Sequence, residues 1–152
     1  MFFSSKNKIV APVKGKYVPL KEVNDPVFSQ GMMGGGVAVI PREEKIVSPV
    51  DGVISMVADQ KHGIGIKMND GTEILMHMGI DTVELKGAPF KIHKTVGDSV
   101  KQGDLLAEMD LDSIEEAGKE TVIMIITTGK EVSKIKHRQS VDVQCLDELA
   151  KI

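Results

Sequence analysis

The stretch "HGIGIKMNDGTEILMHM", residues 62–78, decides the fold class because it reads as two β-strands joined by a short turn. Asp70-Gly71 is a dipeptide typical of the two-residue type I′ hairpin loop, and aliphatic and β-branched residues flank it on both sides. With these two residues as the loop, Ile64 lies opposite His77 on the neighbouring strand. The stretch therefore predicts an antiparallel β-hairpin.

The same register brings two histidines onto one face of the hairpin. His62 lies two residues beyond the partner of His77, so their Cβ atoms are expected on the order of 7 Å apart. A three-residue loop would reverse this parity, because successive side chains of a strand point to opposite faces. The rest of the predicted face is aliphatic or glycine: Ile64 and Ile66 on one strand, Leu75 and Gly79 on the other.

Short apolar segments alternate with glycine-containing turns along the rest of the chain. The segments are 37–40, 53–57, 64–68, 73–78, 105–109 and 121–126. Residues 112–120 indicate a helix of one or two turns, with Ser113 and Glu116 as a capping box and Gly118 as the stop. This pattern predicts an all-β fold, an antiparallel sandwich or barrel with at most one or two very short helices.

Two heptapeptides resemble each other. "IVAPVKG" covers residues 9–15 and "IVSPVDG" covers residues 46–52. Proline favours a strand end or a bend, and glycine favours a turn. Read as a duplication, the pair predicts two related β-halves packed against each other.

Composition limits the class of protein. The 152 residues suit one domain, and the formal net charge of −3 gives no basic surface for nucleic acid. No apolar run approaches the length of a membrane span, so we expect no direct membrane insertion. A single cysteine and too few apolar residues in "MFFSSKNK" for a signal peptide favour a cytoplasmic protein. Residues 1–8 are expected to form a loose N-terminal segment.

The histidine pair is compatible with three kinds of chemistry. A zinc site needs three or four ligands, and beyond the two imidazoles only Asp81 suggests itself. Acid–base catalysis needs a pocket with orienting polar groups, which the sequence does not indicate. Covalent phosphoryl transfer needs one imidazole nitrogen with a free lone pair and a second N–H donor nearby. An apolar face around them would suit docking of a partner protein.

One long motif resembles a known family. "HMGIDTVELKG", residues 77–87, is similar to the signature of the glucose-class EIIA component of the bacterial phosphoenolpyruvate:sugar phosphotransferase system. Further matches are "DPVFSQGMMGGGVAVIP" and "VGDSVKQGDLLAEMD", together with both heptapeptides and the spacing of the two histidines. The resemblance runs from Ile9 to near the C-terminus. It implies a single EIIA type 1 domain over residues 1–152, with the antiparallel β-sandwich or barrel-sandwich of the family, which is of the duplicated hybrid motif type.

The resemblance also implies a phosphotransferase with a phosphohistidine intermediate, which serves sugar uptake. His77 would accept a phosphoryl group on Nε2 from the carrier protein HPr and pass it to a cysteine of an EIIB domain. His62 would stabilise the phosphate, and the backbone carbonyl of Gly79 would hold the other ring nitrogen of His77. Gln60 stands where the family has a threonine that orients the second histidine, so its amide is expected to take that role. No cofactor is required for this chemistry.

The resemblance further implies a docking surface for these partners. Two acidic residues are expected in it, Asp25 and Asp81. Six apolar residues are also expected in it: Phe28, Met32, Val83, Ile64, Leu75 and Met78. The last three stand where family members commonly have phenylalanine, so the surface is more aliphatic here. An alternative function is regulatory: the unphosphorylated protein would bind other transporters or kinases, with zinc held by His62, His77 and a partner carboxylate.

Overall fold

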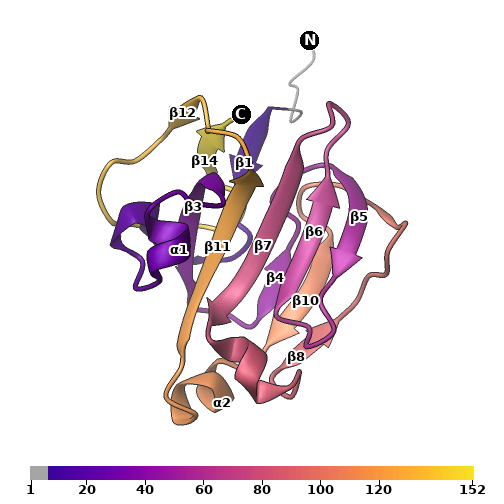
Figure 1. Cartoon of the computed structure of the whole chain (residues 1–152), viewed down its shortest axis with the longest axis vertical. Coiled ribbons are helices and arrows are strands. Elements are labelled where there is room, and N and C mark those ends of the chain that lie inside the picture. The colour runs from indigo at the N-terminus through magenta and orange to yellow at the C-terminus, as the bar shows by residue number, and fades with distance from the viewer. Residues whose placement is uncertain (1–6) are drawn as a thin grey trace.

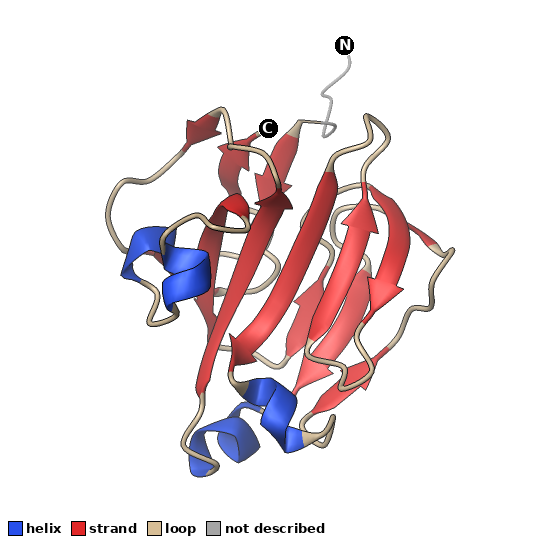
Figure 2. Ribbon diagram, viewed as in Figure 1, coloured by secondary structure: helices blue, strands red, loops and turns tan. Residues whose placement is uncertain are grey.

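The computed structural model describes residues 7–152, which form open antiparallel β-sheets packed face to face (Figure 1). The strands are β1 (Lys8–Val10), β2 (Gly15–Val18), β3 (Gly34–Pro41), β4 (Lys45–Val47), β5 (Gly52–Val57), β6 (Gly63–Lys67), β7 (Glu73–Ile80), β8 (Phe90–Ile92), β9 (Ser99–Val100), β10 (Leu105–Met109), β11 (Glu120–Thr128), β12 (Lys134–Ile135), β13 (Val141–Val143) and β14 (Glu148–Lys151). The helices are α1 (Pro26–Ser29) and α2 (Leu111–Glu116), with 3₁₀ turns η1 (Leu20–Glu22) and η2 (Thr82–Leu85). Figure 2 shows how little of the described chain is helical. The predicted all-β fold is confirmed.

Within residues 7–152 the strands form one large sheet and two small ones. The eight-stranded sheet has the order β13-β2-β3-β11-β7-β6-β5-β9, and the three-stranded sheets have the orders β1-β14-β12 and β4-β10-β8. Figure 1 shows β4, β10 and β8 behind the large sheet. The main core joins the layers: Ile74 and Met76 of β7 pack in one buried cluster with Ile46 of β4 and Leu106 of β10. The fold is therefore a β-sandwich.

The two resembling heptapeptides lie at the centre of an internal pseudo-symmetry. The N–H of Val10 donates to the carbonyl of Pro49 at 3.0 Å, and the N–H of Val47 donates to the carbonyl of Pro12 at 2.9 Å. These are equivalent bonds, because Val10 corresponds to Val47 and Pro12 to Pro49 in the aligned motifs. The strand order of the large sheet has the same symmetry about β11 and β7. The two β-halves predicted from the repeat are thus present and packed together.

The predicted register of the 62–78 hairpin is wrong by one residue. Gly63, not Ile64, lies opposite His77, because the loop has three residues, 69–71, instead of two. Gly71 adopts a φ of +91°, as a three-residue loop of this kind requires. The shift turns Ile64 and Ile66 away from the face of His77 and into the core, where both are fully buried.

The start of helix α2 differs from the prediction. Helix α2 begins at Leu111, and Asp110 is its N-cap: the Asp110 carboxylate accepts from the N–H of Ser113, so Ser113 is not the cap. The expected stop at Gly118 is confirmed, since α2 ends just before it. At the end of the expected loose N-terminal segment, Lys8 pairs with Lys151 in the small sheet, and the Asn7 carbonyl accepts from the N–H of Ile152 at 2.8 Å. Residues 1–6 of that segment lie outside the described residues.

An outer layer covers the middle of the large sheet. Phe28 of α1 and Val23 after η1 pack on Ala38, Met124 and Ile126, which point away from the main core. These segments therefore shield one part of the outer face and leave the neighbouring part, over β7 and β6, for the histidines. Among residues 7–152, no helix is both long enough and apolar enough to cross a membrane.

Candidate active site

His77 stands on the outer face of β7, between two core residues. Met76 and Met78 are fully buried, whereas the alternate side chains of Leu75 and His77 are half-buried on the other face. The Nδ1 atom of His77 lies 2.8 Å from the carbonyl oxygen of Gly79. A carbonyl can only accept, so Nδ1 carries the proton and Nε2 keeps the lone pair.

The backbone around Gly79 is shaped for this contact. Gly79 has a φ of +85°, which residues with a Cβ rarely adopt. Strand β11 has an irregular register between Glu120 and Ile123, opposite this glycine. A bulge of this kind interrupts the regular ladder and re-aims the backbone. The structure thus brings the Gly79 carbonyl to the ring nitrogen, where the family resemblance expects it.

His62 approaches His77 by a route different from the predicted one. It precedes β6, after Lys61 with a φ of +64°, so strand alternation does not set the direction of its side chain. The ring centroids of the two histidines lie 5.2 Å apart at 78°. The N–H of Met78 donates to the carbonyl of His62 at 2.7 Å, which fixes the backbone of His62 to β7. The predicted proximity is present although the predicted register is not.

Gln60 acts on His62 through its backbone and not through its side-chain amide. The Nδ1 atom of His62 is buried and has no hydrogen-bond partner within residues 7–152, so the amide side chain of Gln60 does not hold it. Burial lowers the pKa of His62 below its ordinary value, and the nearby backbone of Gln60 opposes this shift. The expected role of the Gln60 amide in orienting His62 is therefore wrong in this conformation.

The pKa of His77 is lowered from its ordinary value, chiefly by burial. The Gly79 carbonyl opposes the shift, His62 adds to it, and the carboxylates of Asp25 and Asp81 oppose it. Since desolvation disfavours the charged ring, the neutral imidazole predominates near neutral pH. His77 is therefore in the form that can act as a nucleophile.

Helix α1 forms one wall of the site. The ring of Phe28 lies 5.0 Å from that of His77 at 51°, and Phe28 is only 9% exposed. The carboxylate of Asp25 caps the helix by accepting from the N–H of Val27 at 3.0 Å. Asp25 therefore both anchors this wall and adds negative charge near His77.

Replacement of Asp25 should separate its capping role from its charge. Asp25→Asn keeps a capping oxygen, whereas Asp25→Ala should lower the free energy of unfolding by about 1 kcal/mol. Both variants remove the carboxylate that raises the pKa of His77, so that pKa should fall in both. Urea unfolding and NMR titration of His77 measure the two effects. Equal loss of stability in the two variants would contradict the capping role.

The expected docking residues divide into exposed and buried ones. Met32 and Val83 are 70% and 46% exposed, and Asp81 is also exposed. Ile64 and Met78 are fully buried in the core, so the expectation that they contact a partner is wrong. Their burial follows from the one-residue shift of register and from strand alternation on β7.

The sequence analysis missed two exposed apolar residues beside this surface. Val27 is 44% exposed and Met33 is 38% exposed. Both lie in the motif that supplied Phe28 and Met32, so their position next to those residues was the available signal. They extend the apolar part of the surface along α1 and the turn after it.

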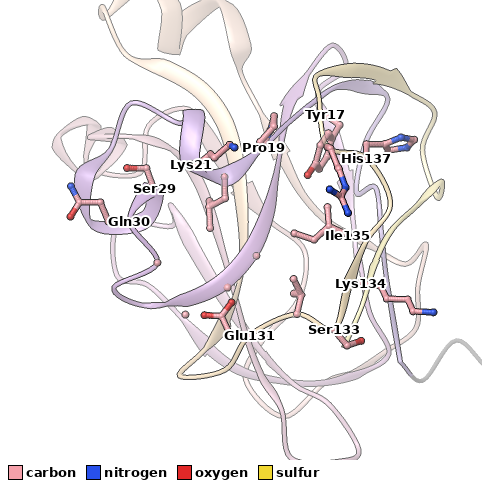
Figure 3. Close-up of a pocket in the computed structure, with 17 residues that line it drawn as sticks. Tyr17, Pro19, Lys21, Ser29, Gln30, Glu131, Ser133, Lys134, Ile135 and His137 are labelled. Carbon is pink, nitrogen blue, oxygen red and sulfur yellow. The ribbon is translucent and has the colours of Figure 1, made fainter.

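A surface groove of about 800 Å³ lies apart from the histidine pair. Figure 3 shows it between α1, with Ser29, and the 131–138 segment, where Ile135 points inward and the ends of Lys134 and His137 point away. Neither His62 nor His77 lines it. The two histidines therefore lie outside this groove, on the outer face of the large sheet.

The site does not fit a resident zinc ion. Within residues 7–152 no group of three or more histidine, cysteine, aspartate or glutamate side chains is placed to hold a metal. Two imidazoles alone leave the tetrahedral coordination of zinc incomplete. The other two histidines are elsewhere: His93 pairs with Glu108 at 2.7 Å, and His137 packs against Tyr17.

A β-sandwich whose outer face carries a neutral histidine with a free Nε2, a second imidazole and an apolar surface has the groups that a phosphotransferase domain with a phosphohistidine intermediate needs. The sequence model of the phosphoenolpyruvate-dependent sugar phosphotransferase system, EIIA 1, matches residues 7–132. The chain therefore belongs to this EIIA family, which carries phosphoryl groups in sugar uptake.

Relatives and a solved structure agree with this assignment. The chain is 44% identical over 131 residues to the glucose-specific EIIA component of Bacillus cereus, covering 86% of this chain and 79% of the relative. It is 40% identical over 146 residues to the glucose-specific EIICBA component of Streptococcus pneumoniae, covering 95% of this chain but only 20% of that longer protein. Glucose permease IIA from Mycoplasma capricolum superposes with a TM-score of 0.86 at 35% identity, covering 99% of both chains.

Proposed function

We propose that this chain accepts a phosphoryl group on Nε2 of His77 from phosphorylated HPr and passes it to a cysteine of an EIIB domain. The observation that carries the proposal is the 2.8 Å contact between Nδ1 of His77 and the Gly79 carbonyl, with a second imidazole 5.2 Å away. It leaves one nitrogen free to react and fixes the direction of its lone pair.

Each transfer breaks one bond to phosphorus and forms another. In the first, the Nε2 lone pair of His77 attacks the phosphorus, and the electrons of the donor's P–N bond return to the donor imidazole. The Nδ1 proton stays on His77, where the Gly79 carbonyl stabilises the positive charge that develops on the ring. In the second, a thiolate of EIIB attacks, and the His77 ring leaves as a neutral imidazole. Catalysis is mostly positioning and charge stabilisation.

The charges around His77 suit a carrier that must release its phosphate. Besides burial, the groups of residues 7–152 that shift the pKa of His77 are the Gly79 backbone, His62, Asp25 and Asp81, with no lysine or arginine among them. A strong cationic clamp would stabilise the phosphorylated form and oppose onward transfer. His62 therefore supplies the stabilising donor, and the carboxylates keep the phosphoryl group easily transferred.

The partners follow from the exposed part of the site. Met32 and Val83 offer apolar contacts, and exposed Asp81 with half-buried Asp25 offers negative charge for basic side chains of HPr. Relatives named EIICBA components, from Streptococcus pneumoniae and Bacillus subtilis, support an EIIB acceptor. Leu75 and Phe28 would support this surface from below. The exchange requires no metal or other cofactor, and we place it in the cytoplasm, where phosphoenolpyruvate is available.

Reconstitution tests this proposal directly. The protein is incubated with EI, HPr and phosphoenolpyruvate carrying labelled phosphate. We expect label on this chain that is lost in acid and survives base, as a phosphohistidine requires, and that depends on HPr. Acid-stable label, or no label with active EI and HPr, would overturn the proposal.

Phosphoryl acceptance should depend on pH through His77. The folded-state pKa lies below the ordinary value of about 6.5, so the rate should rise with pH through that lower pKa and level off by about pH 7. At a pH between the folded-state and the unfolded-state pKa of His77, the unfolded chain binds more protons than the folded one. The free energy of unfolding should therefore also fall as the pH decreases through this range. NMR titration of the His77 ring beside initial rates of phosphorylation provides the check. A midpoint above 6.5 would contradict the expected burial effect.

A further inference from the structure

Thr82 is a buried polar residue that the proposed mechanism does not use. It opens η2, five residues after His77 and within the 77–87 motif, and it has no exposed surface. Its Oγ1 donates to the backbone carbonyl of Met78 at 2.6 Å. A buried hydroxyl with a short bond to the backbone beside a reactive residue suggests a role in shaping that backbone.

The accepting carbonyl lies in the peptide unit that precedes Gly79. That unit sets one side of the Gly79 φ angle, which has the unusual value of +85°. Thr82 also packs directly on Gly79, since a Cβ built on this glycine would clash with Cγ2 of Thr82. The hydroxyl and the methyl group of Thr82 therefore act on the residue whose carbonyl holds Nδ1 of His77.

The same stretch of backbone also reaches His62. The N–H of Met78 donates to the carbonyl of His62 at 2.7 Å, while its own carbonyl accepts from Thr82. The backbone of Met78, directly after His77, thus bonds both to the backbone of His62 and to the side chain of Thr82. A rotation of the Met78–Gly79 peptide would change the direction of the Gly79 carbonyl.

We propose that Thr82 is a positioning residue that selects the reactive tautomer of His77 through its hydrogen bond to the Met78 carbonyl. By fixing the Met78–Gly79 peptide, it keeps the Gly79 carbonyl on Nδ1–H and so leaves the lone pair on Nε2. Thr82 itself does not contact the phosphoryl group. This inference concerns the site of the proposed function, and it rests on that function only for its effect on rate.

The test replaces the hydroxyl and the methyl group of Thr82 separately. Thr82→Val keeps the shape and removes the donor, whereas Thr82→Ser keeps the donor and removes the methyl group. Thr72→Val is a matched control, because Thr72 is also buried but lies just before β7, beside the hairpin loop and far from His77 along the strand. Two-bond ¹H–¹⁵N spectra of the His77 ring report which nitrogen carries the proton.

We expect the Nδ1–H form in the wild type, in Thr82→Ser and in Thr72→Val, and a mixture with the Nε2–H form in Thr82→Val. Phosphoryl acceptance should fall about tenfold in Thr82→Val alone, the scale seen when an orienting partner is lost. Full retention of the Nδ1–H form in Thr82→Val would overturn the inference. So would loss of that form in Thr82→Ser, a result that stays informative if Thr82→Val does not fold. The spectra need no phosphoryl donor, so failure of the proposed function would appear only in the labelling assay.

Discussion

His77→Ala should abolish phosphorylation of this chain by EI, HPr and phosphoenolpyruvate. The variant loses the nucleophile itself, so we expect the rate to fall by at least about 10⁴-fold, below detection. His62 should not substitute, because the Gly79 carbonyl orients the ring of His77 and not that of His62. Labelling followed by peptide mapping measures the result.

The matched control for this prediction is His93→Ala. His93 pairs with Glu108 on the opposite sheet and is not part of the histidine pair, so this variant should be labelled normally. An unchanged thermal unfolding midpoint of His77→Ala would show that the variant is folded and that it loses labelling because it lacks the nucleophile. Label mapped to His62 in the wild-type protein would show that the roles of the two histidines had been assigned the wrong way round.

His62→Gln should accept a phosphoryl group but donate it poorly to EIIB. An attacking thiolate brings a negative charge to the transition state, which a neutral imidazole nucleophile does not. The ring of His62, 5.2 Å from that of His77, is the donor placed to offset this charge. Loss of one such donor costs about 10²- to 10³-fold in rate, so we expect that loss in donation and less than about tenfold in acceptance.

Single-turnover transfer to a purified EIIB domain distinguishes the two steps. The phosphorylated variant is prepared with EI and HPr, isolated and mixed with EIIB, and loss of label is followed with time. Gln60→Ala is a useful companion, because its side-chain amide does not bond His62 and the variant should donate normally. Wild-type donation by His62→Gln would remove His62 from the mechanism.

Both predictions depend on the outer face of the large sheet around His77. The sequence indicated which kinds of residue form this face, but it did not indicate which individual side chains lie on it. The histidines, the glycine that orients one of them and the exposed Met32 and Val83 all lie within motifs that can be recognised from local residue order. Ile64 and Met78 lie in or beside the same motifs, yet they are core residues. Local order cannot separate these groups, because aliphatic side chains occupy both faces of the hairpin.

Local signals were sufficient to predict six of the fourteen strands in the described part of the chain, together with the repeat. Apolar segments between glycine turns mark β3, β5, β6, β7, β10 and β11, because strand formation follows residue type and turn chemistry over a few positions. The repeated heptapeptides indicated two related halves, because the same residue order favours the same strand and turn in each. The "HMGIDTVELKG" motif pointed to His77 through its resemblance to the EIIA signature.

Only the tertiary structure decided the register and the contacts that make the site work. The 69–71 loop and the burial of Ile64 depend on how the hairpin packs on the opposite sheets, which a two-residue turn signal cannot report. The contact between Phe28 and His77 joins elements 49 positions apart in the sequence, and the bond of Thr82 to Met78 requires the unusual backbone at Gly79. These features arise from close packing of distant segments, and the residue order of any one segment does not contain them.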